Sequence, residues 1–262
     1  MDSALFTSNT IQLFLLVFVR IAGMIFLLPV FGATNVPITI KIGLSAVLTV
    51  LCFPLMALKG PVALPPHIIM FVIMVLKEIA IGLIIGFAAS LLFTVIQFAG
   101  HLADSQMGFT FVELVDPFTD MPVTTLGQFQ ILIFTILFLL LNGHYFLLLA
   151  IQKSFEVIPL GGASHLFAGR TLEQLIVMTG DIFVLAMRLA APVFSILLVT
   201  TVALGIVSRT VPQLNIFFMG MPISIIVGLG MTILTLPMLA HLFKTMVESM
   251  TTDIVKLFYL MA

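Results

Sequence analysis

Residues 68–98 read IIMFVIMVLKEIAIGLIIGFAASLLFTVIQF, and this apolar stretch decides the fold class. A helix needs about 20 apolar residues to cross a hydrocarbon core about 30 Å thick. Comparable blocks occupy about residues 11–31, 38–58, 129–151, 175–207 and 216–242. The blocks are continuous, whereas a membrane β-barrel shows alternating segments of about 10 residues. The sequence therefore predicts an all-α, polytopic membrane protein with about six long helices, and residues 241–260 predict a further, amphipathic terminal helix.

The composition excludes a soluble enzyme and a nucleic-acid-binding module. Of the 262 residues, 61% are hydrophobic and 8% are charged, and the mean hydropathy is +1.32. A soluble domain carries about 25% charged residues, which it needs to cover its surface. The net charge is −1, and no basic cluster supports binding to nucleic acid. The surroundings of this chain are therefore membrane lipid or other apolar protein.

Several charged residues lie inside the apolar blocks, where each would cost about 2.5–3.5 kcal/mol at the bilayer centre. Lys77 and Glu78 are adjacent, so they point about 100° apart on a helix and do not face each other. Asp181 and Arg188 share a face but lie about 10 Å apart along the axis. The partners of these residues and of Arg20 must come from other helices or other chains, unless individual side chains reach out to the membrane surface.

Small residues and prolines predict closely packed, kinked helices. Two series recur at every fourth position, one comprising Glu78, Gly82, Gly86, Ser90 and Thr94, the other Gly220, Ser224, Gly228 and Thr232. Such faces let helix backbones approach closely, within one chain or between chains. Prolines within the blocks interrupt the backbone hydrogen bonds of a helix and kink it. Together these features predict helical hairpins packed into a larger helical assembly.

The longest polar connection, about residues 100–126, carries acidic residues interleaved with apolar ones. This pattern predicts a loop that folds back into a pocket or lumen, or one that packs on its own helices. Basic residues in the connections favour cytoplasmic termini by the positive-inside rule.

The sequence lacks the motifs of common catalytic sites. It has no His-Glu-x-x-His zinc motif and no phosphate-binding Gly-x-x-x-x-Gly-Lys loop. His101 and Asp104 could share a metal ion, but no third ligand accompanies them. We therefore expect no enzymatic activity, no metal and no cofactor. A small-molecule transporter with broken helices and a site near Asp181 and Arg188 is the alternative.

Short motifs follow one another in a fixed order along nearly the whole chain. The first is RIAGMIFLLPVFG at residues 20–32, and the longest is RTVPQLNIFFMGMP at residues 209–222. Between them stand Val36-Pro37, Lys41, Glu78, Gly82, Gly86, Gly100, Asp104, Gln106, Gly108, Asp116-Pro117, Gly143-His144 and Ala191-Pro192. In residues and spacing this series resembles the FliR/SctT family of type III secretion export-gate subunits.

The resemblance implies a structural and gating subunit of the flagellar type III protein-export channel, which helps to form and plug the pore for unfolded flagellar proteins. It implies one copy of this chain assembled with FliP-like and FliQ-like subunits, beside a FlhB-like subunit, in the bacterial inner membrane at the flagellar basal body. The chain would be a single export-gate domain, FliP-like over about residues 1–170 and FliQ-like over about 171–262. The equivalent subunit of a virulence injectisome is the closest alternative.

The resemblance also implies roles for individual residues. The plug segment of the family matches Met107, Gly108, Phe109, Thr110, Phe111 and Val112. Buried charges expected to make inter-subunit contacts are Arg20, Lys77, Glu78, Asp181, Arg188 and Arg209. Glycines expected to pack helices together are Gly82, Gly86, Gly220 and Gly228.

Overall fold

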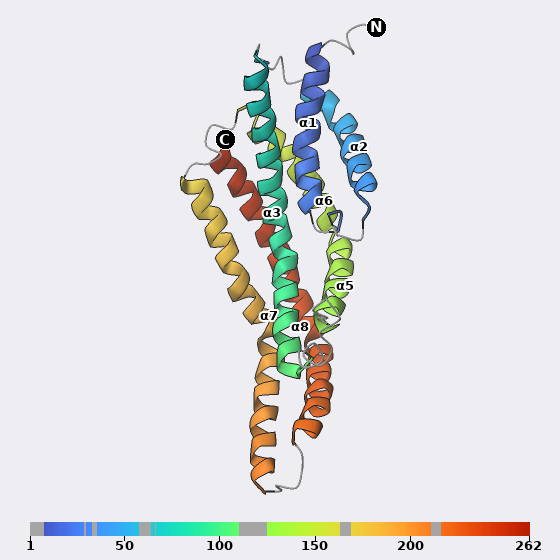
Figure 1. Ribbon diagram of the computed structural model, residues 1–262, viewed down its shortest axis with the longest axis vertical. Coiled ribbons are helices and arrows are strands. Elements are labelled where there is room, and N and C mark those ends of the chain that lie inside the picture. Colours follow the sequence, from blue (N-terminus) through green and yellow to red (C-terminus); the bar gives the residue numbers. More distant parts are fainter. Residues whose placement is uncertain are drawn as a thin grey trace. The chain divides into compact units, whose positions relative to one another are not determined.

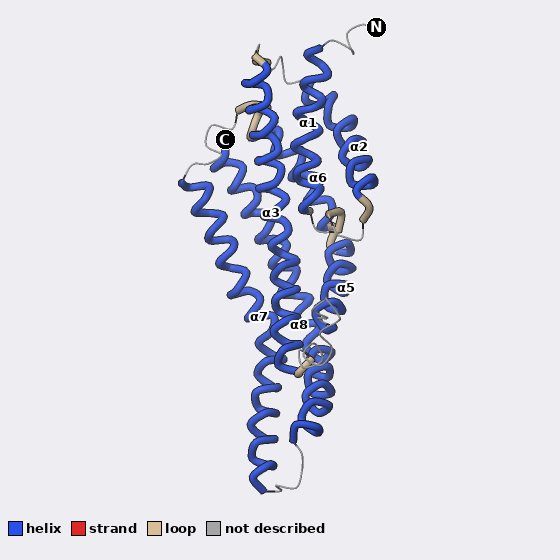
Figure 2. Tube along the Cα trace, viewed as in Figure 1, coloured by secondary structure: helices blue, strands red, loops and turns tan. Residues whose placement is uncertain are grey.

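The computed structural model describes residues 8–28, 30–32, 36–57, 64–65, 67–109, 125–162, 169–210 and 216–262. Helices make up nearly all of this part, and no strand occurs in it (Figures 1 and 2). The helices are α1 (Ser8–Leu27), α2 (Ile38–Ala57), α3 (Ile68–Met107), α5 (Thr125–Leu140), α6 (Gly143–Val157), α7 (Gly169–Thr210) and α8 (Ile216–Met261). The predicted all-α class is confirmed.

Four helical segments are long and apolar enough to cross a membrane: Asn9–Leu27, Ile68–Met107, Gly169–Thr210 and Phe218–Met261. The pair α5 and α6 becomes a fifth if it is taken as one broken span, while α2 contributes only a shorter apolar segment, Ile38–Pro54. The polytopic helical fold is thus confirmed with somewhat fewer spans than the six apolar blocks suggested. Helices are the expected result, because only internal hydrogen bonds can satisfy the backbone in lipid.

Three helix boundaries differ from the predicted ones. Helix α3 continues to Met107, so the first residues of the expected loop are helical. The block at residues 129–151 is split into α5 and α6 next to Asn142, whose left-handed backbone (φ 57°) interrupts the helix. Helix α8 runs without a break through residue 241, where a separate helix was expected. In its last turns the buried residues recur every three or four positions, at Phe243, Met246, Val247, Met250, Ile254, Leu257, Phe258 and Met261, which confirms the predicted amphipathic character.

Several hydroxyl groups inside these apolar helices donate to a carbonyl of their own helix. The Ser45 hydroxyl donates to the carbonyl of Lys41 at 2.7 Å, and that of Thr232 donates to the carbonyl of Gly228 at 2.8 Å. Both bonds join residues four positions apart, the usual arrangement for Ser and Thr in helices. A polar side chain can therefore sit in an apolar helix without a partner from another segment.

The chain divides into two compact units, and the first comprises Met1–Leu91, Asn142–Met178 and Glu248–Ala262. Helices α1 and α2 pack together here, with the rings of Phe14 and Phe53 edge to face at 5.9 Å. Lys41, at the start of α2, donates from Nζ to the carbonyl of Gly32 at 2.8 Å. The core of this unit includes Leu16, Ile21, Met24, Ile81 and Ile85.

The second unit comprises Leu92–Leu141 and Thr179–Val247. Its core contains a cluster of buried side chains from α3, α5 and α7, namely Ala103, Met107, Leu126, Val193 and Leu197. The rings of Phe134 and Phe243 also meet in it at 4.8 Å. The two units do not coincide with the parts 1–170 and 171–262 that the resemblance implies, and that division stays a prediction.

Candidate functional site

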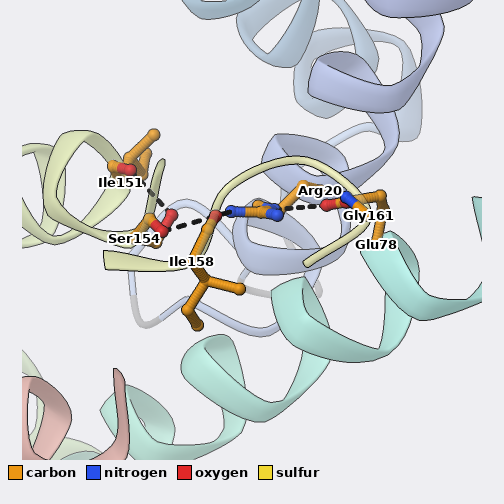
Figure 3. A network of polar contacts seen from close by, with 6 residues as sticks. All are labelled: Arg20, Glu78, Ile151, Ser154, Ile158 and Gly161. Carbon is orange, nitrogen blue, oxygen red and sulfur yellow. Dashed lines mark hydrogen bonds and ion pairs between the residues drawn. The ribbon is translucent and has the colours of Figure 1, made fainter. Parts of the chain in front are cut away.

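The first unit contains a fully buried charge at Arg20, in the second half of α1. Its side chain is 0% exposed, and so is that of Glu78 on α3. The Nε group of Arg20 donates a hydrogen bond to Oε2 of Glu78 (Figure 3). A buried ion pair is retained without penalty only when further hydrogen bonds satisfy its remaining donors and acceptors. The other hydrogen bonds of Arg20 and Glu78 therefore decide how well the buried pair is stabilised.

Arg20 also caps the carboxyl end of α6. Its Nη1 donates to the carbonyl of Ile158 at 2.8 Å and to that of Ser154 at 3.2 Å (Figure 3). Carbonyls in the last turn of a helix lack intrahelical partners, and a cation is favoured there by the helix dipole. The guanidinium lies over the ring of Phe155, 4.4 Å from its centroid, which adds a cation–π contact.

Glu78 uses its second oxygen to hold the turn that follows α6. The amide of Gly161 donates to Oε1 of Glu78 at 2.9 Å. Gly161 has a φ of 77°, a conformation that glycine adopts without strain. One ion pair therefore joins α1, α3 and the end of α6 with its turn. Within the described residues, Arg20 Nη2 is a buried nitrogen with no hydrogen-bond partner.

Glycines bring α1 and α3 close enough for this pair to form. A Cβ atom at Gly82 would collide with the carbonyl oxygen of Arg20, and one at Gly86 would lie 2.7 Å from the carbonyl oxygen of Met24. Glu78 precedes Gly82 by one helical turn, so the close crossing carries its carboxylate to Arg20. The small-residue series of the sequence thus packs α3 against another helix of the same chain.

The other predicted charges lie in different surroundings. Lys77 is half-buried on α3, whereas Asp181 and Arg188 are exposed on α7. Arg209 is exposed in the last turn of α7, where a cation suits the helix dipole. No ion pair joins any of these four to another described residue. Arg20 and Glu78, in contrast, form an ion pair with each other within the chain.

Of the predicted plug residues, Met107, Gly108 and Phe109 are described, while Thr110, Phe111 and Val112 lie outside the described residues. Met107 is 1% exposed and belongs to the buried cluster of the second unit, against which Phe109 packs. Gly108 has a φ of 91° and ends α3. A Cβ atom at Gly228 would collide with the Met107 side chain, so this glycine of α8 makes room for it. Gly220 is half-buried near the start of α8.

Asp104 has a role that sequence reasoning missed. Its Oδ1 accepts a hydrogen bond from the amide of Leu126 at 3.0 Å, and its Oδ2 accepts one from the amide of Gly127 at 3.2 Å. These amides belong to the first turn of α5, where helix N–H groups have no intrahelical acceptor. No local spacing rule connects an acidic residue with a helix that starts so much later in the chain. Within the described part of the protein, no group of three or more His, Cys, Asp or Glu could hold a metal ion.

The Arg20–Glu78 pair and the Asp104 site both lie in the part of the chain that matches a known protein family. Residues 11–250 match the family described as bacterial export proteins, family 1. The chain belongs to this family. The matched region contains every described helix, apart from the first residues of α1 and the last residues of α8. The fold and both sites therefore belong to the family domain.

Curated relatives extend along most of the chain. The flagellar biosynthetic protein FliR of Bacillus subtilis is 33% identical over 242 residues, which cover 90% of this chain and 92% of that protein. FliR of Escherichia coli is 28% identical over 232 residues, 86% of each chain. The surface presentation of antigens protein SpaR of Shigella flexneri is 32% identical over 148 residues, 56% of each chain. The similarity to the FliR proteins is thus the more extensive one.

Family membership and the helices together define the class of this bacterial export protein. Its apolar helices are long enough to cross a membrane several times, and the family consists of export proteins. The chain is therefore a membrane-protein component of an export apparatus.

Proposed function

We propose that the chain is a structural and gating subunit of the flagellar type III protein-export channel, through which unfolded flagellar proteins leave the cell during flagellum assembly. The observation that carries this proposal is the similarity to FliR, 33% identical over nine-tenths of both chains. The long apolar helices agree with it. The proposed role is structural, with no enzymatic step and no cofactor.

Exposed charges on an apolar helix support assembly with other subunits. Asp181 and Arg188 are exposed in the middle of α7, a helix of 42 residues. Each would cost about 2.5–3.5 kcal/mol in lipid, so a protein partner is the favourable neighbour. We expect one copy of this chain to assemble with FliP-like, FliQ-like and FlhB-like subunits in the inner membrane, at the basal body. Lys77 and Arg209 are further candidates for these contacts, whereas the buried Arg20 and Glu78 are not.

The gating part of the proposal concerns Met107, Gly108 and Phe109 and the three residues that follow them. Met107 and Phe109 pack on a buried cluster, which gives this segment a fixed base. A segment anchored in this way can block a lumen without being displaced as a whole. Thr110, Phe111 and Val112 enter the proposed plug through their match to the family segment alone.

Genetic complementation tests the proposed function. The chain is expressed in a motile bacterium that lacks its own FliR, and secreted flagellar filament protein is measured in the medium. We expect export to return, and a tagged chain extracted in mild detergent to carry FliP-like and FliQ-like subunits with it. A chain that stays a monodisperse monomer and is stabilised by a small solute would instead support the transporter alternative.

The similarity to SpaR supports a second candidate function, that of the equivalent injectisome subunit. This similarity covers 56% of the chain, less than the similarity to FliR. The same complementation in a Shigella strain without SpaR distinguishes the two. We expect restoration in the flagellar strain and not in the injectisome strain, and the reverse result would assign the chain to the injectisome.

A further inference from the structure

We propose that Asp104 is the positioning residue of the plug. Through its backbone carbonyl it fixes the point at which Gly108 and Phe109 leave α3, and through its carboxylate it fixes the first turn of α5 at the same place. This inference rests on the proposed gating function and names a residue on which that function depends.

The carbonyl of Asp104 accepts the hydrogen bonds that end α3. The amides of Gly108 and Phe109 both donate to it at 3.1 Å, and the amide of Gly108 also reaches the carbonyl of Ser105 at 3.3 Å. With Gly108 in a left-handed conformation, these bonds form a Schellman motif, which stops a helix at a defined residue. The point at which Gly108 and Phe109 leave α3 is therefore fixed by the backbone carbonyl of Asp104.

The carboxylate of Asp104 binds the first turn of α5, beside the end of α3. The side chain is 1% exposed and accepts the amides of Leu126 and Gly127, one with each oxygen. These are charge-assisted hydrogen bonds, stronger than those between neutral groups, and the amino end of a helix favours an anion. Asp104 therefore serves α5 as an N-cap although it lies on another helix.

Close packing brings the two helices within reach of this side chain. A Cβ atom at Gly100, one turn before Asp104, would collide with the Cα atom of Gly127. Ala103 and Met107 of α3 share a buried cluster with Leu126 of α5. The carboxylate thus sits where α3 and α5 touch, and residues 109 and 125, which flank the rest of the connection, are held close to one side chain.

Amide hydrogen exchange in the assembled complex tests the positioning directly. The variants are Asp104→Ala, which removes the carboxylate, Asp104→Asn, which keeps one acceptor oxygen, and the neighbouring exposed Ser105→Ala as a matched control. In Asp104→Ala we expect the amides of Leu126 and Gly127 to exchange about fivefold faster or more, the usual effect of losing a side-chain cap. The amides of Gly108 and Phe109 should change less, because the carbonyl remains. Unchanged exchange at Leu126 and Gly127 would overturn the proposal.

Ion conductance of the closed complex in a lipid bilayer tests the link to gating. We expect Asp104→Ala to leak ions, Asp104→Asn to leak less, and Ser105→Ala to behave as the unmodified complex does. Deletion of residues 108–112 serves as the reference for a lost plug. If the deletion leaks and neither Asp104 variant does, the positioning role is wrong and the plug stands.

The conductance of the deletion variant also separates the gating function from the positioning role of Asp104. If the deletion itself does not leak, the gating function fails, while the exchange rates still report whether Asp104 holds the two helices. If Asp104→Ala does not assemble, Asp104→Asn decides, because an amide of the same shape fits the site. Faster exchange at Leu126 and Gly127 with a leaking pore in that variant would support the proposal, and normal exchange with a tight pore would overturn it.

Discussion

Arg20 shows how much of one unit can depend on a single side chain. It contacts Glu78 on α3 and the last carbonyls of α6, and it lies over Phe155. An apolar pair of similar volume could be as stable as this ion pair, but loss of one partner leaves the other charge buried and unpaired. Removing one charge of the network should therefore destabilise the protein much more than removing both charges.

We predict that Arg20→Met strongly destabilises the protein. The substitution leaves the carboxylate of Glu78 buried without its cation, which costs about 3–5 kcal/mol. Thermal unfolding of the complex in detergent measures this loss. The double variant Arg20→Met with Glu78→Leu should recover much of the stability, because both charges are gone. A single variant as stable as the unmodified protein would contradict the assigned role of the pair.

We predict opposite effects of alanine at two helical glycines. Gly82→Ala places a Cβ atom against the backbone of Arg20, so α1 and α3 must separate and the protein is destabilised. Gly43→Ala meets nothing within 4 Å, and in a helix alanine is more favourable than glycine by about 0.5–1 kcal/mol. Unfolding temperatures of the two variants test this. Equal destabilisation at both sites would mean that the close crossing is not the cause.

At the scale of the elements, the end of α3 sets the point at which the proposed plug segment leaves the helix. The sequence predicts a loop from about residue 100, but the helix continues to Met107. The extra turns bring Asp104 and Met107 onto α3, where they contact α5 and pack in the buried cluster. The helix stops at Gly108 because this residue adopts a positive φ of 91°.

We predict that the residue at position 108 controls this helix end. Gly108→Ala forces a side chain into a left-handed conformation, which costs about 1–2 kcal/mol. Gly108→Asn should be better tolerated, because Asn is the next most common residue at this position of a helix cap. Exchange of the Phe109 amide should rise more in the Ala variant than in the Asn variant. The opposite order would show that φ at residue 108 does not limit the site.

At the scale of the whole molecule, the exposed surface of α7 indicates a protein neighbour. Among its exposed residues Asp181 and Arg188 are charged, while Phe183, Val184 and Met187 are apolar. Such a surface suits neither water nor lipid, because it presents both kinds of group along one helix. A subunit interface that pairs the charges and buries the apolar side chains would satisfy both.

We predict that Asp181→Ala and Arg188→Ala each weaken assembly while the chain still inserts in the membrane. The substitutions remove charges that the proposed partner subunits pair. The measurement is the amount of FliP-like and FliQ-like subunits that purifies with the tagged chain. Lys153→Ala is the control, because Lys153 forms an exposed pair with Glu156 of its own helix at 3.5 Å, and such pairs contribute little. Normal assembly in both test variants would contradict an interface on this surface.

The sequence by itself determined the helical membrane class, the presence of long apolar segments and the family. These follow from hydropathy and from short motifs, both of which are local properties of the chain. The ends of the helices were harder to predict from the sequence. A residue such as Asn142 or Gly108 ends a helix only when it adopts a left-handed conformation, and the folded backbone decides that.

Only the tertiary structure decided which polar groups meet. The sequence predicts that Glu78 needs a partner outside its own helix, but nothing in the sequence selects Arg20, 58 positions away, over the other charges. In the same way the sequence places Asp104 beside His101 as a possible metal ligand, whereas its contacts in the structure include the amides of Leu126 and Gly127. The physical reason is that hydrogen bonds and ion pairs act over a few ångströms of space, and folding brings together residues that are far apart in the chain.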